Sequence, residues 1–131
     1  MIQQVAGDGY TLQGNATVIL QHNGAADQGV IEAPSLVKHG APPTYLLFFS
    51  GGCFTTPRYN VQYATSASLL GPYTRAKVPL FETGTGRQGL RAPGGASVYR
   101  DGKHLLFHAD WKGGRALYEA AITIEGAEVT A

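Results

Sequence analysis

Cysteine, runs of charge and long apolar stretches are scarce in this 131-residue chain, and each scarcity excludes a class of protein. Cys53 is the only cysteine, which rules out an internal disulfide and a zinc site built from thiolates. The 10 basic and 9 acidic side chains give a net charge of +1 without a basic run, so no nucleic-acid partner is expected. No apolar run reaches the roughly 18 residues of a membrane span, and the first residues lack the pattern of a signal peptide. We therefore expect neither a membrane partner nor an export signal in these residues.

Helical periodicity is also missing from most of the chain, whereas turn-forming residues are plentiful. The 18 glycines, the 7 prolines and an aromatic content of 10% are typical of many short strands joined by tight turns. A hydrophobic content of 44% over 131 residues can bury one core and does not require two domains. The sequence therefore predicts an all-β fold in a single domain.

Alternating and apolar runs place the individual strands. They predict strands over 16–20, 29–38, 44–50 and 58–66, and a turn at Gly71-Pro72-Tyr73 into a short edge strand. Residues 44–50 are apolar on both faces, so this strand is expected deep in the core. The Gly-rich connection over 81–95 is as long as loops that often serve a site.

Two short patterns recur along the chain. The residues from Ser35 to Gly40 are echoed from Ser97 to Gly102, an offset of 62, and those from Tyr45 to Phe49 are echoed from His104 to His108, an offset of 59. Repeats of four-stranded units at this period are typical of β-propeller blades. Echoes of this kind also arise by chance in an antiparallel meander, so the pattern leaves both readings open.

The stretch from Gly29 to Val37 sets one carboxylate, Glu32, inside an otherwise apolar strand. A carboxylate taken out of water is costly unless it is paired or holds its proton, so burial of Glu32 needs a reason. An acid that keeps its proton near neutral pH can serve as a general acid. The alternative is a salt bridge from Glu32 to Lys38, Arg58 or Arg115. Pro34 cannot donate to a ladder, so this strand is expected either to have an unpaired edge or to stop pairing at Pro34.

Several short motifs follow one another in a characteristic order. They are Ile31-Glu32-Ala33-Pro34-Ser35, the aromatic strand from Tyr45 to Ser50, Tyr63-Ala64-Thr65-Ser66 with Leu70-Gly71-Pro72-Tyr73, and the run from Gly113 to Tyr118. Together they resemble the catalytic domains of glycoside hydrolase family 43 over nearly the whole chain. The loop from Cys53 to Tyr59 is most similar to fungal-type members of that family.

This resemblance implies a fold and an activity. The fold would be a partial five-bladed β-propeller, about its last half, with antiparallel four-stranded blades and blade remnants at about 1–28, 29–80 and 92–131. The activity would be hydrolysis, with inversion, of arabinose- or xylose-containing oligo- or polysaccharides. By its motif, Glu32 would be the general acid. Family members are commonly exported, which implies an extracellular protein.

The resemblance also implies two further acids, a base and an Asp that tunes Glu32, on strands that would lie upstream of Met1. Asp8 and Asp27 stand in turn-like settings, where Asp usually caps the backbone, so neither is expected to replace the base. The 131 residues alone are therefore expected to lack glycosidase activity. Two rival readings are a carbohydrate-binding, lectin-like module and an inactive truncated fragment.

The substrate-binding candidates are Arg115, Phe54, Cys53 and Ser50. Arg115 could bind sugar hydroxyls or hold Glu32; the alternative is a surface arginine paired with Asp110 or Glu119. Phe54 offers an aromatic face for a sugar ring, whereas Tyr59 and Trp111 are expected in core packing. Cys53 has the alternative of a small buried apolar residue.

No cofactor and no metal are expected. Many relatives place a His near a central cation where this chain has Gly95, and His108 is more typical of a core histidine. His22, His39 and His104 are expected in solvent. The strand edges of an incomplete propeller favour self-association or insolubility of the isolated chain.

Overall fold

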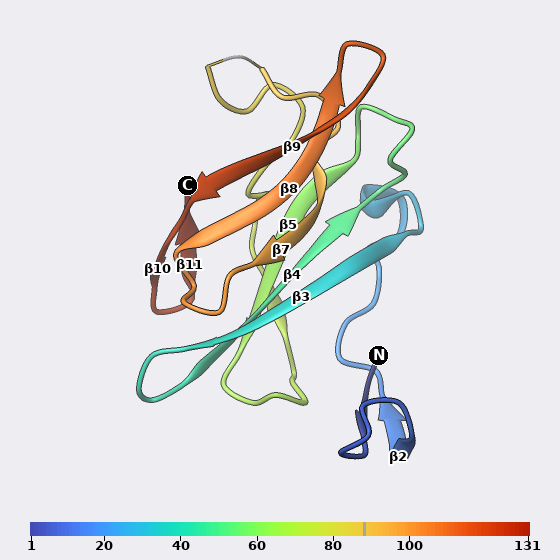
Figure 1. The fold of residues 1–131 in the computed structure, drawn as a ribbon, viewed down its shortest axis with the longest axis vertical. Helices are drawn as coiled ribbons and strands as arrows, with labels where there is room; N and C mark the ends of the chain where they lie inside the picture. Colours follow the sequence, from blue (N-terminus) through green and yellow to red (C-terminus); the bar gives the residue numbers. More distant parts are fainter. Residues whose placement is uncertain (88) are drawn as a thin grey trace.

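The computed structural model describes residues 1–87 and 89–131, and it is built almost entirely of antiparallel strands (Figure 1). The elements are β1 (Ile2–Val5), β2 (Leu12–Thr17), the 3₁₀ helix η1 (Gly24–Asp27), β3 (Ile31–His39), β4 (Thr44–Gly51), β5 (Asn60–Ser66), β6 (Thr74–Arg75), β7 (Gly94–Val98), β8 (His104–Trp111), β9 (Gly114–Ala121), β10 (Thr123–Glu125) and β11 (Glu128–Thr130). The all-β expectation is confirmed. Within the described ranges, no helix is long and apolar enough to cross a membrane.

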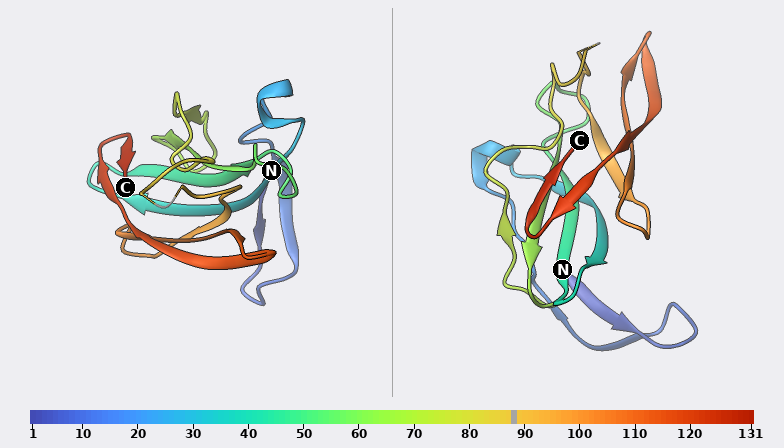
Figure 2. Two further views of the ribbon diagram at one scale, coloured as in Figure 1. Left: turned by 90° about the horizontal axis from the view of Figure 1, so that it is seen from above. Right: turned by 90° about the vertical axis from the view of Figure 1, so that its left-hand side faces the viewer.

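Two sheets form the body of the molecule. One has the strand order β3-β4-β5-β6 and the other β7-β8-β9, and they lie as two layers (Figure 2). The main core lies between them, where Leu46 and Phe48 of β4 pack with Leu105 and Phe107 of β8. A smaller cluster on the other face of β4 contains Phe49. Because β4 is buried on both faces, the expectation that 44–50 lies deep in the core is confirmed.

The strand β3 is an edge of its sheet, as Pro34 predicted, and it carries a bulge at its start. Between the facing pairs Glu32–Ser50 and Ser35–Phe48, β3 has one residue more than β4. Ala33 accommodates the extra residue with a φ of 52°, in the left-handed region. A bulge bends its strand and changes the direction of the neighbouring side chains, so it decides where Glu32 points.

The strand β7 carries the same bulge at the same place. Between its facing pairs Gly94–His108 and Ser97–Leu106, β7 again has one residue more than β8, and Gly95 takes a φ of 63°. Gly94 is thus the structural equivalent of Glu32 at an offset of 62 residues. The first of the two echoes in the sequence therefore marks equivalent positions in the two sheets.

The second echo, which relates Tyr45–Phe49 to His104–His108, is shifted by one residue from the structural equivalence of β4 and β8. Since Ser35 faces Phe48 and Ser97 faces Leu106, equivalent residues of β4 and β8 are 58 apart, and the offset of 59 would exchange the two faces of the sheet. With the corrected offset, Phe107 is the equivalent of Phe49. Phe49 lies on the face of its sheet turned away from β7–β9, whereas Phe107 faces β3–β6. Both sheets therefore stack in the same sense, which is typical of successive propeller blades.

The first 28 residues differ most from expectation. In place of a strand over 16–20, they form the β1–β2 hairpin, which ends at Thr17 and projects from the two layers (Figure 1). Ile19 and Leu20 follow without strand pairing and pack against the cluster around Phe49. An apolar run that covers a sheet face has the same composition as a strand, which explains the error. In the 81–95 connection, Gln88 lies outside the described residues.

Candidate active site

Glu32 stands at the bulge of β3 and is exposed, so the expectation of a buried carboxylate is wrong. Its Oε1 accepts a hydrogen bond of 2.7 Å from the Tyr59 hydroxyl. The residue also borders a cavity of about 110 Å³ whose other walls are mostly apolar, with Ile31, Leu47 and Phe49 among them. Among the described residues, none of the ion pairs involves Glu32, which disfavours the salt-bridge alternative. One oxygen of the carboxyl group is thus anchored to a buried side chain.

Tyr59, in the loop before β5, is that buried side chain, with 2% of its surface exposed. Its ring stacks on the His108 imidazole, with the centroids 6.1 Å apart. It also passes directly over Gly94, where a Cβ atom would lie 1.9 Å from a ring carbon. Burial raises the pKa of Tyr59, and the hydrogen bond to Glu32 adds to the rise while one from Ser50 opposes it. Tyr59 therefore keeps its proton at neutral pH and acts as the donor toward Glu32.

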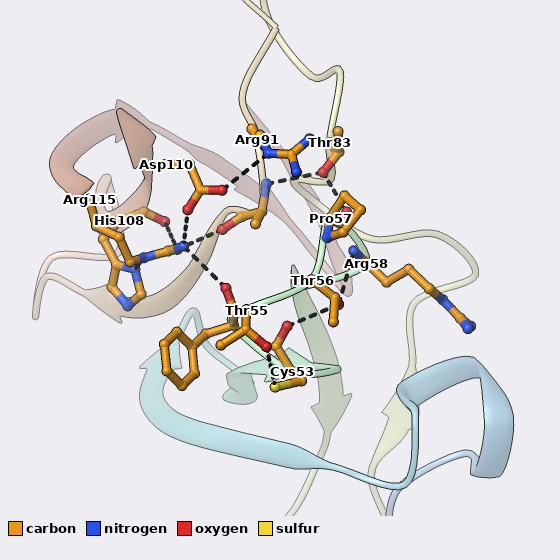
Figure 3. Close-up of polar contacts among 12 residues, drawn as sticks. Cys53, Thr55, Thr56, Pro57, Arg58, Thr83, Arg91, His108, Asp110 and Arg115 are labelled. Atoms are coloured by element: carbon orange, nitrogen blue, oxygen red, sulfur yellow. Dashed lines mark hydrogen bonds and ion pairs between the residues drawn. The ribbon is translucent and has the colours of Figure 1, made fainter. Parts of the chain in front are cut away.

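Arg115, at the start of β9, is held at the centre of a set of acceptors (Figure 3). Its Nε donates to His108 Nδ1 at 2.5 Å, its Nη1 to Asp110 Oδ1 at 2.6 Å, and its Nη2 to the Ala92 carbonyl at 2.6 Å. Two longer bonds reach the carbonyls of His108 and Phe54, at 3.1 Å and 3.5 Å. A guanidinium has five N–H donors, and each one has an acceptor here.

The arrangement partly matches the expectation for Arg115. The pair with Asp110 is confirmed, while Glu119 pairs with His104 instead. The side chain is 22% exposed, so Arg115 is not a surface arginine. Its guanidinium carbon lies 5.6 Å from the centre of the Tyr59 ring, and it therefore reaches Glu32 only through Tyr59.

Comparisons with known proteins bear on this arrangement. No protein-family model and no curated protein matches the sequence. Among solved structures, the chain is similar to an endo-1,4-beta-xylanase from Bacteroides thetaiotaomicron, with 31% identity, a TM-score of 0.67, and coverage of 77% of this chain and 37% of the xylanase. A thermostable family-43 glycoside hydrolase matches at 22% identity and a TM-score of 0.79, over 98% of this chain and 45% of the hydrolase.

A GH43 endo-arabinanase from Bacillus licheniformis also matches 98% of this chain, at 20% identity and a TM-score of 0.78. The chain has the fold of family-43 glycoside hydrolases. It spans less than half of these solved chains, covering 37% of the xylanase, 45% of the family-43 hydrolase and 47% of the arabinanase. The resemblance drawn from the sequence motifs agrees with this finding, and the fungal-type likeness stays a prediction.

Within the family-43 fold, the other substrate-binding candidates lie around Arg115. Ser50 is fully buried, and its Oγ accepts the Gly95 N–H at 2.8 Å, which ties β4 to β7. Phe54 is 54% exposed, and its backbone carbonyl lies 3.5 Å from Arg115 Nη1. Cys53 is half-buried; hydrogen bonds from Thr55 lower the pKa of its thiol, and its Sγ lies 3.1 Å from Thr55 Oγ1 (Figure 3). Contact of these residues with a sugar stays a prediction.

Of the two other acids considered from sequence, Asp8 serves the backbone as expected, whereas Asp27 accepts one backbone N–H and also forms an ion pair with Arg75. Asp8 accepts the N–H groups of Tyr10 and Thr11 in the β1–β2 turn. Asp27 is 1% exposed and binds the Arg75 guanidinium at 2.8 Å. Burial opposes the charge of Asp27, but the hydrogen bonds that it accepts and the nearby Arg75 hold its pKa below the ordinary value. Both carboxylates are therefore engaged in the structure of the chain.

His108 faces Gly94 across the β7–β8 pair and fills the space beside Gly95, where a Cβ atom would lie 2.3 Å from His108 Nε2. Because Nδ1 accepts from Arg115, the neutral ring carries its proton on Nε2. Burial and the Arg115 charge lower the pKa of His108. His22 is exposed, and His39 and His104 are half-exposed, so only His22 lies fully in solvent as expected. The described residues contain no group of three or more potential metal ligands, and the expectation of no metal stays a prediction.

Acidification is expected to destabilise the chain through His108. The folded-state pKa of His108 is lowered, so the unfolded state binds more protons. The contribution of neutral His108 is complete above about pH 6.5 and is lost as the pH falls through the folded-state pKa. Urea unfolding at about pH 7.5 and about pH 5.5 measures the difference, which should shrink in His108→Asn. The exposed His22 provides the control, and an equal shrinkage in His22→Asn would reject this assignment.

Proposed function

We propose that the chain is about the last half of a five-bladed family-43 propeller whose complete domain hydrolyses arabinose- or xylose-containing polysaccharides. The observation that carries this proposal is the position of Glu32. The residue stands at the bulge of an inner edge strand of the family-43 fold, exposed, with one carboxyl oxygen anchored to Tyr59. The similar structures support the substrate class, since they include a xylanase and an arabinanase.

In the proposed reaction, the Glu32 carboxyl group gives its proton to the glycosidic oxygen of the leaving sugar. As the bond between the anomeric carbon and that oxygen breaks, a water molecule adds to the opposite face of the sugar and a base takes its proton. Inverting enzymes keep the two carboxyl groups about 6.5–9.5 Å apart so that this water fits. Asp8 and Asp27 are engaged elsewhere, so we place the base outside residues 1–131.

The remaining candidates have proposed positions in this site. Phe54 is exposed and offers a ring for the apolar side of a sugar, with Cys53 beside it. Ser50 faces Glu32 across the β3–β4 pair, and Arg115 lies over the Tyr59 ring that holds Glu32. A polysaccharide substrate places the complete domain outside the cell, and the apolar face at the 110 Å³ cavity favours self-association of the isolated chain.

The test is a chimera in which this chain replaces the matching 47% of the Bacillus licheniformis endo-arabinanase. We expect the chimera to hydrolyse arabinan or an aryl glycoside, and Glu32→Gln to lower kcat by about 10²–10⁴-fold, because glutamine cannot donate the proton. Glu125→Gln, on β10, is the matched control and should leave kcat unchanged.

Three results would contradict parts of this proposal. A folded chimera that binds arabinan, shows no turnover and is unaffected by Glu32→Gln would favour a lectin-like module instead. The 131 residues alone are expected to be inactive, and hydrolysis by them that Glu32→Gln abolishes would disprove the placement of the base outside the chain. A chain without a cooperative unfolding transition would point to an inactive fragment.

A further inference from the structure

We propose that Tyr59 is the positioning residue of Glu32: the buried Tyr59 hydroxyl donates to Oε1 and holds it, and Oε2 is left to carry the transferred proton. This inference rests on the proposed function, because it assigns a role to each oxygen of the acid. Tyr59 does not touch the substrate in this assignment. It acts on the reaction only through Glu32.

The direction of each hydrogen bond follows from the donors and acceptors. The Gly95 N–H can only donate, and it does so to Ser50 Oγ at 2.8 Å. Ser50 also lowers the pKa of Tyr59, which is the effect of a donor beside the Tyr59 oxygen. The single proton of Tyr59 is left for Glu32 Oε1, at 2.7 Å. When Glu32 is protonated, Oε1 is occupied as an acceptor, so the acidic proton resides on Oε2.

The Tyr59 ring cannot follow Glu32 if that side chain moves. It is confined on one side by Gly94, which has no Cβ, and on another by the His108 ring. The Arg115 guanidinium lies over it at 5.6 Å and is itself fixed by acceptors from several loops and strands. A rigid donor therefore faces a flexible, exposed acid. Rigid support of this kind keeps a reacting group within the small tolerance that catalysis allows.

Gly94 also explains why the ring is there. It occupies the bulge position equivalent to Glu32, and its missing side chain opens the space that the Tyr59 ring fills. The same structural position therefore serves the acid in one sheet and its support in the other. This relation is visible only when the two bulges are superimposed.

The first experiment uses the free chain and requires no activity. Three-bond NMR couplings of Glu32 are expected to report one dominant rotamer in the parent chain and averaging over rotamers in Tyr59→Phe, which keeps the ring and removes the hydroxyl. Tyr99→Phe, whose ring lies beside His104, is the matched control and should leave the couplings unchanged. Unchanged couplings in Tyr59→Phe would overturn the proposal.

The second experiment uses the arabinanase chimera. Tyr59→Phe is expected to lower kcat by about 10–100-fold with little change in KM, because substrate binding is untouched while the acid is misplaced. If Glu32→Gln inactivates the chimera but Tyr59→Phe does not lower kcat, the positioning role is wrong while the hydrolase function stands. If the chimera is inactive whatever stands at position 32, the hydrolase function fails, and the couplings alone decide whether Tyr59 holds Glu32.

Discussion

Replacing Asp27 with alanine is expected to lower the free energy of unfolding by about 3–5 kcal/mol, the usual cost of breaking a buried ion pair from one side. Asp27 is 1% exposed and joins η1 to the sheet through Arg75, Gln62 and the Asn23 N–H. Its removal leaves the Arg75 guanidinium without its carboxylate. Gln62 loses an acceptor at the same time.

Urea unfolding followed by circular dichroism measures this loss. Asp8→Ala is the matched control, because Asp8 also accepts backbone N–H groups but lies in an exposed turn; its loss should be much smaller. Adding Arg75→Met to Asp27→Ala should recover part of the stability, since the unpaired charge is then gone as well. Equal losses for Asp27→Ala and Asp8→Ala would show that burial of the pair does not matter.

Acidification is also expected to destabilise the chain through Asp27, in a different pH window from its effect through His108. The pKa of Asp27 is lowered in the folded state, so the unfolded state binds the proton more tightly. The stabilisation is therefore complete above the unfolded value of about 3.9 and is lost as the pH falls below it. The two groups can be separated because the contribution of His108 begins to be lost below about pH 6.5, above the range of Asp27.

Replacing Gly94 with alanine is expected to have the second large effect. The new Cβ would lie 1.9 Å from one carbon of the Tyr59 ring and 2.4 Å from two others, so the buried ring must move. Overpacking of this kind costs about 1–3 kcal/mol, and here it also pulls the Tyr59 hydroxyl away from Glu32. The arabinanase chimera with Gly94→Ala should therefore lose at least as much kcat as Tyr59→Phe.

Gly7→Ala is the control, because a Cβ there meets no atom within 4 Å. It should leave both the stability and kcat of the chimera nearly unchanged. The effects of Gly94→Ala and Tyr59→Phe on kcat should not add, since both act on the same hydrogen bond. Full additivity would mean that Gly94 matters for a reason other than the Tyr59 ring.

Much of the fold could be predicted from the sequence, because the signals are local. The strands expected over 29–38, 44–50 and 58–66 correspond to β3, β4 and β5 with bounds that differ by at most two residues. Their alternation and the Gly and Pro residues between them depend only on near neighbours in the chain. The strand over 16–20 failed because burial of Ile19 against a sheet face leaves the same composition as strand pairing.

The site was harder to predict, because its contacts join distant segments. The pair of Asp110 and Arg115 could be expected, since the two residues face each other across the β8–β9 hairpin. The bond from Tyr59 to Glu32 spans 27 residues, and no local pattern indicates it. The exposure of Glu32 also depends on which other segments cover β3. The apolar residues next to Glu32 in the sequence do not indicate this.

Under the proposed function, the two matching bulges serve catalysis only because the repeated units differ at the shared position. At the shared position one unit kept an acid, Glu32, and the other has no side chain at all, at Gly94. In the proposed reaction, a chain made symmetrical with glycine at both places would have no proton donor. A chain made symmetrical with glutamate at both places would have no room for the Tyr59 ring, so neither kind of internal consensus sequence should give an active arabinanase chimera.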